Sequence, residues 1–139
     1  MSVTYRAGIA YGIVIPSDEM YEGLKNFANA IKSKEDLPEW FDTFESWYQE
    51  IIENEDYNKL TELLYEDDIL INLDGYCNSA NYILGYCLDC VDWGAKSLET
   101  TLPMDAVPLM KCKIIKWYQK LFPDKEIPQP QLLLYSQVW

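Results

Sequence analysis

The spacing of apolar residues changes along the chain, and each change marks a different predicted element. Over residues 4–15 the large apolar side chains recur at every second position, which predicts a β-strand. Over residues 17–32 and again over 36–52 they recur at intervals of three and four, which predicts two amphipathic helices. A shorter helix is expected to follow Asp56 and to end near Asp68.

Strand patterns return in the second half of the chain. Residues 69–73 and 82–91 are rich in β-branched and aromatic side chains, and turn-forming residues lie between them, which predicts a hairpin. A last helix is expected from about residue 105 up to Pro123, followed by a strand over 131–138. We therefore expect one α+β domain over residues 1–139. It would have a mostly antiparallel sheet of about four strands packed with about four helices, in the order β-α-α-α-β-β-α-β.

Two local features of the first strand and helix carry further expectations. Gly8, Ala10 and Gly12 share one face of the strand, and a surface this small lets a helix approach closely. The glycines lack the spacing of a phosphate-binding loop, so we interpret them as packing residues. Ser17 follows Pro16 and is expected to cap the helix that begins there.

Charge is concentrated in one quarter of the chain. The 139 residues include 23 acids and 11 bases, for a net charge of −12. Thirteen of the acids lie within residues 35–68, where Lys59 is the only base, so this acidic segment carries the whole net charge. We predict that it binds a partner, and the candidate partner-binding residues are Glu39, Asp42, Glu45, Glu50, Glu53, Glu55, Asp56, Glu62, Glu66, Asp67 and Asp68. The same charge argues against direct binding to nucleic acid or to anionic membranes.

The sequence lacks the usual residues of acid–base and nucleophilic catalysis. It contains no histidine, and most of its acids are expected on solvated helix surfaces. Asp74, Asp89 and Asp92 lie near predicted strand ends, yet nothing distinguishes them as catalytic. We therefore predict no catalytic residues and no enzymatic activity.

Four cysteines include one Cys-x-x-Cys motif, formed by Cys87 and Cys90. Cys77 and Cys112 would have to complete a zinc site, but structural zinc sites usually contain two close pairs of ligands. In a regular strand the two thiols of the motif would point to opposite faces. We predict that the cysteines are reduced core residues, with no metal or cofactor, in a cytoplasmic protein without a membrane-spanning segment.

These patterns favour a non-enzymatic interaction or inhibitor module that presents an acidic helical surface to a basic, nucleic-acid-binding protein. Carboxylates spaced along a helix imitate the charge density of a nucleic-acid backbone. In size and charge the chain resembles small acidic accessory proteins of phages and mobile elements. One alternative is a small-molecule-binding or sequestering domain, in which aromatic residues line a pocket and the chain forms a homo-oligomer. An enzyme that uses carboxylates or cysteines is a third interpretation.

Overall fold

The computed structural model describes residues 5–31, 51, 53–66, 68–73, 81–95, 97 and 105–138. For these residues it gives the bounds of four strands, three α-helices and one 3-10 helix, η1. In chain order they are β1 (Tyr5–Pro16), α1 (Ser17–Ile31), η1 (Tyr57–Leu60), α3 (Thr61–Glu66), β2 (Leu70–Asn72), β3 (Asn81–Asp92), α4 (Val107–Leu121) and β4 (Gln131–Val138).

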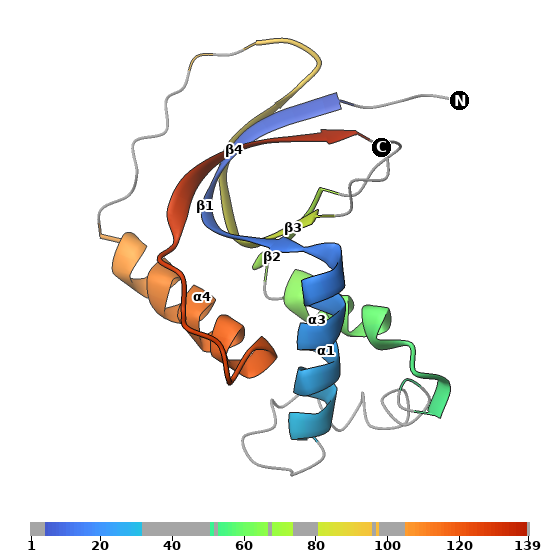
Figure 1. Cartoon of the computed structure of the whole chain (residues 1–139). Helices are drawn as coiled ribbons and strands as arrows, with labels where there is room; N and C mark the ends of the chain where they lie inside the picture. The colour runs from blue at the N-terminus through green and yellow to red at the C-terminus, as the bar shows by residue number, and fades with distance from the viewer. Residues whose placement is uncertain are drawn as a thin grey trace.

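The strands form a single sheet in the order β2-β3-β1-β4, and every neighbouring pair is antiparallel (Figure 1). The predicted α+β class and the antiparallel sheet of four strands are confirmed. The predicted number of helices is wrong for the described part of the chain, where only α1 and α4 are long helices. The predicted third helix is divided between η1 and the six-residue α3, so the element order also differs.

Most of the helix predicted over residues 36–52 lies outside the described residues. The described positions next to its expected end, residues 51, 53 and 54, are helical. None of the helices in the described ranges is long and apolar enough to cross a lipid bilayer.

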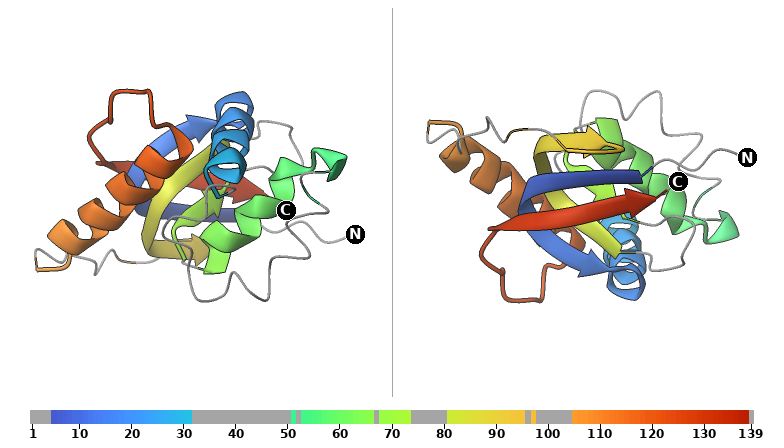
Figure 2. Two further views of the ribbon diagram at one scale, coloured as in Figure 1. Left: turned by 90° about the horizontal axis from the view of Figure 1, so that it is seen from below. Right: turned by 90° about the horizontal axis from the view of Figure 1, so that it is seen from above.

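The sheet is strongly curled, so that it has an inner and an outer face (Figures 1 and 2). Helices α1, α3 and α4 all lie on the outer side, and none of them enters the curl. The curl brings the two edge strands together, since the Gln137 side-chain amide of β4 donates a hydrogen bond of 2.7 Å to the Asn72 carbonyl of β2. The inner face is therefore surrounded by all four strands.

The main core lies between the outer face and the helices. Tyr11, Ile13 and Ile15 alternate along β1 and are buried against the apolar stripes of α1 and α4. Leu24 and Ile114 are fully buried, each contributing roughly 1.5–3 kcal/mol by leaving water. The buried residues of both helices recur at intervals of three and four, and they are Met20, Leu24, Phe27 and Ala28 in α1 and Ile114, Trp117, Tyr118 and Leu121 in α4.

The small face of β1 does not receive a helix, so that prediction is wrong. Gly8 and Ala10 lie on the inner face, where the ring of Tyr135 covers them from β4. A Cβ atom at Gly8 would lie 2.4 Å from Cζ of that ring. The small residues make room for an aromatic side chain from a neighbouring strand.

Glycine has a second use further along the same strand. Gly12 of β1 is paired with Gly85 of β3, and a Cβ atom on either residue would lie within 2.4 Å of a backbone oxygen of the other strand. The two strands therefore cross at this point more closely than side chains would permit.

The predicted cap of α1 is also wrong. Helix α1 begins at Ser17, but the Ser17 hydroxyl is buried and makes no hydrogen bond to any described group. Asp18 and Glu19 do occupy the first turn, where a negative charge interacts favourably with the helix dipole.

Candidate functional site

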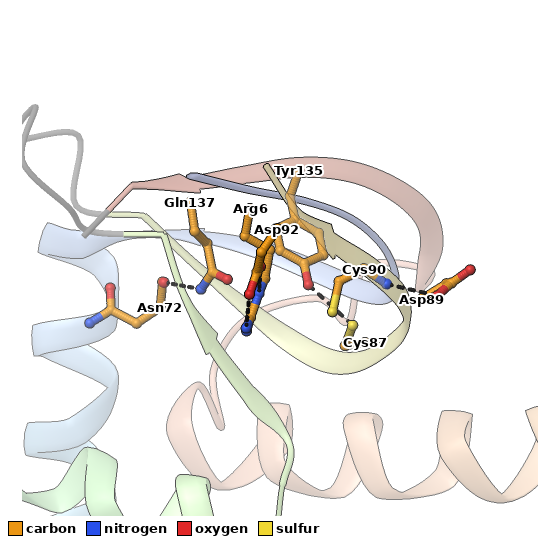
Figure 3. A network of polar contacts seen from close by, with 8 residues as sticks. All are labelled: Arg6, Asn72, Cys87, Asp89, Cys90, Asp92, Tyr135 and Gln137. Carbon is orange, nitrogen blue, oxygen red and sulfur yellow. Dashed lines mark hydrogen bonds and ion pairs between the residues drawn. The ribbon is translucent and has the colours of Figure 1, made fainter. Parts of the chain in front are cut away.

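The inner face of the curled sheet carries a network of polar contacts (Figure 3). Arg6 of β1 pairs with Asp92 of β3, and Tyr135 of β4 donates to the sulfur of Cys87. Cys90 lies beside Cys87, and Gln137 contacts β2 as described above. Side chains from three strands thus meet over the small residues of β1.

A β-bulge in β3 places both cysteines of the Cys-x-x-Cys motif on this face. The register of β1 against β3 pairs Ala10 with Cys87 and Gly8 with Cys90, leaving Leu88 as the extra residue. Because Gly8 and Ala10 are two residues apart on one strand, their partners share a face. The prediction that the two thiols point to opposite faces is therefore wrong.

The sulfur of Cys87 accepts a hydrogen bond from β4. The Tyr135 hydroxyl lies 3.2 Å from Cys87 Sγ, and Cys90 lies beside Cys87 on the same face. Burial raises the pKa of the Cys90 thiol, and the neighbouring Cys87 raises it further. Burial and the hydrogen bond to Cys87 likewise raise the pKa of Tyr135 well above its usual range. Both neighbours therefore keep their protons, and the Tyr135 hydroxyl donates its proton toward Cys87.

Arg6, near the start of β1, and Asp92, at the end of β3, form an ion pair with two hydrogen bonds. Arg6 Nε and a terminal guanidinium nitrogen lie 2.6 and 3.1 Å from the two Asp92 carboxylate oxygens. This hydrogen-bonded pair raises the pKa of Arg6 and lowers the pKa of Asp92. Such planar fork geometry is the strongest form of ion pair between these groups.

The three described cysteines are not the core residues that we predicted. Cys87 and Cys112 are exposed and Cys90 is half-buried, and none of the three forms a disulfide. Cys112 lies on α4, and Cys77 lies outside the described residues. No group of three potential metal ligands occurs within the described ranges. The paired thiols were detectable in the sequence as a motif, but their shared face depends on the bulge.

The predicted partner-binding residues are only partly described. Glu53, Glu55 and Asp68 are exposed, and Asp56 is half-buried. Glu62 and Glu66 belong to α3, but their side chains are not described. The remaining five lie outside the described residues, and they are Glu39, Glu45, Asp42, Glu50 and Asp67.

Asp68 closes helix α3 in a left-handed backbone conformation, with φ of 53°. The Ile69 amide donates to the Leu64 carbonyl at 3.1 Å, and the Asp68 amide donates to the Tyr65 carbonyl at 3.0 Å. These two bonds are those of a Schellman motif, in which glycine normally occupies the left-handed position.

Glu55 is placed in a similar way. Its φ is 55°, and the next amide, that of Asp56, donates to the Ile51 carbonyl at 3.1 Å. Both acids therefore follow a helical segment in a conformation that disfavours a side chain. The partial negative charge of a helix C-terminus also repels a carboxylate. Sequence patterns did not reveal these positions, since an acid is an unusual residue there.

A groove of about 720 Å³ lies along α1 and the turn that follows α4. Tyr21 and Phe122 supply its aromatic lining, and its acids include Glu19, whose carboxylate forms an ion pair of 3.6 Å with Lys125. The pocket expected in the alternative interpretation would lie between sheet and helices, whereas this groove lies on the outer surface of the helices.

Comparison of the chain with protein-family models, with curated proteins and with solved structures finds no match. The function must therefore be inferred from the residues and their arrangement.

Proposed function

We propose that this protein is a non-enzymatic interaction or inhibitor module whose acidic segment, residues 35–68, binds a basic partner. The partner would be a nucleic-acid-binding protein, and the carboxylates would occupy part of its nucleic-acid site as a mimic. The proposal includes a cytoplasmic location and a phage-like or mobile-element origin. The free thiols of the three described cysteines support the first, and the size and charge of the chain support the second.

The observation that carries the proposal is the placement of Glu55 and Asp68. Both are exposed, both have positive φ, and both lie at the C-terminal end of a helical segment. Backbone sterics and the helix dipole each disfavour an acid at these positions, so stability does not explain their presence. Strained polar residues of this kind are typical of functional surfaces.

Neutralising the described acids tests this surface. We would compare the full chain with a triple variant, Glu53→Gln, Glu55→Gln and Asp68→Asn. Proteins captured from the host lysate at low and at high salt would be identified, and each would then be purified for affinity measurements. We expect basic proteins whose capture is reduced by salt and by added duplex DNA. The triple variant should bind them about tenfold more weakly, at roughly 0.5 kcal/mol for each exposed ion pair.

A matched control removes the same charge elsewhere. Asp18→Asn, Glu22→Gln and Asp124→Asn change three exposed acids along the groove beside α1. This control should retain the affinity of the unmodified chain. Equal weakening by both variants would show that only net charge matters. Binding that neither salt nor DNA reduces would contradict nucleic-acid mimicry.

A further inference from the structure

We propose that Cys87 and Cys90 form a thiol–disulfide exchange site that reacts with low-molecular-weight disulfides and closes an intramolecular disulfide. This inference does not depend on the proposed function, because the inner face of the sheet carries the site and the acidic segment does not. It rests on the bulge, on the exposure of Cys87 and on the contacts that its sulfur receives.

The geometry separates the roles of the two thiols. Cys87 is exposed, so an incoming disulfide reaches it first, whereas Cys90 is half-buried beside it. The Tyr135 hydroxyl donates to Cys87 Sγ at 3.2 Å and so fixes the position of this sulfur on the inner face. Cys87 is thus the attacking residue and Cys90 the resolving residue.

The bulge also brings the two cysteines close to the separation that ring closure needs. A disulfide requires its two Cα atoms to approach within about 4.4–6.8 Å. Cys87 and Cys90 are paired with Ala10 and Gly8, which lie two residues apart on β1, and two residues of a strand span about 6.6 Å. A regular strand would hold the two sulfurs on opposite faces.

The chemistry proceeds in two balanced steps. The Cys87 thiolate attacks one sulfur of oxidised glutathione, forms a mixed disulfide and releases one glutathione thiolate. The Cys90 thiol then loses its proton and attacks the Cys87 sulfur, which closes the protein disulfide and releases the second glutathione. Two electrons pass from the protein dithiol to the glutathione disulfide, and the two released thiolates take up the two protons.

Mass spectrometry of the native full-length chain tests the site. The protein would be incubated with oxidised glutathione, quenched in acid, alkylated and analysed intact and after peptide mapping. We expect the unmodified chain to lose two alkylatable thiols from the segment containing Cys87 and Cys90 without retaining glutathione there. Cys90→Ser should trap one glutathione on Cys87, and Cys87→Ser should prevent closure.

Two further measurements test the contribution of Tyr135 and compare the site with a cysteine elsewhere in the chain. Tyr135→Phe should slow mixed-disulfide formation at Cys87 by about threefold, since the sulfur loses the hydrogen bond that holds it in position. Cys112 is exposed on α4 and serves as the reference thiol of the same chain. We expect it to form only a mixed disulfide. Stable glutathione on Cys87 in the unmodified chain, or two thiols that stay reduced while Cys112 reacts, would overturn the proposal.

Discussion

Arg6 and Asp92 show how one residue pair links charge to stability on the inner face. The hydrogen bonds from Arg6 hold the pKa of Asp92 below its ordinary value of 3.8. Because the pKa is lowered in the folded state, the pair stabilises the fold above the unfolded pKa. This contribution is lost as the pH falls through the folded-state pKa.

We therefore expect Asp92→Asn to reduce the free energy of unfolding near neutral pH and to have no effect at strongly acidic pH. Urea unfolding across this range would measure the difference between the two chains. Asp124→Asn removes an exposed carboxylate from the turn after α4 and should leave the free energy of unfolding unchanged over the same pH range. A constant difference at every pH would mean that Asp92 acts through packing and not through its charge.

At the scale of whole elements, the helix ends make the most specific prediction. Asp68 holds a left-handed conformation that glycine adopts without a steric penalty. We expect Asp68→Gly to stabilise the protein by about 0.5–1 kcal/mol, since the relief of strain exceeds the entropy that glycine adds to the unfolded chain. Thermal or urea unfolding would measure the gain.

Two other substitutions separate the backbone effect from the charge effect. Asp68→Asn removes the charge and tolerates the conformation, so a small gain is expected. Asp68→Ala keeps the Cβ atom and should give no gain. A loss of stability in Asp68→Gly would show that the Asp68 side chain contributes to the fold and would weaken the functional argument.

Elements with strong periodicity were predicted well from the sequence. Helix α1 and strand β4 have the expected bounds to within one residue, because their burial follows a single regular period. The curl was not predictable, since it brings together residues far apart in the chain, such as Gln137 with Asn72 and Gly12 with Gly85.

The candidate site was predictable only as a motif. Two cysteines separated by two residues were visible in the sequence, but strict alternation placed them on opposite faces. The bulge at Leu88 reverses that assignment, and it is defined by the register against β1 and not by any residue of β3 itself. Tyr135 was likewise assigned to a strand without any sign that it contacts Cys87.

For the molecule as a whole, the contact between the two edge strands should help to hold the curl. Gln137→Ala removes a side-chain bond of 2.7 Å between β4 and β2 and leaves the ladder bonds in place. We expect a loss of about 1 kcal/mol in the free energy of unfolding. Amide hydrogen exchange should increase in β2 and in the last residues of β4.

Gln131→Ala provides the matched control, since Gln131 is an exposed residue at the start of the same strand. It should leave stability and exchange unchanged. Similar exchange in both variants would show that the curl is maintained by the backbone and the core alone.

The central position of β1 determines when the sheet can be completed during protein synthesis. β1 is the first described element to leave the ribosome, yet its two neighbours are β3 and β4, the last of which ends at Val138 (Figure 1). During synthesis β1 can pair with β3 once Asp92 has been translated, but its other edge stays unpaired until β4 has followed. Pairing over such sequence distances is slow, and an open strand edge is prone to association with other chains. The edge of β1 that receives β4 is therefore open to misassociation for longer than the edge that receives β3.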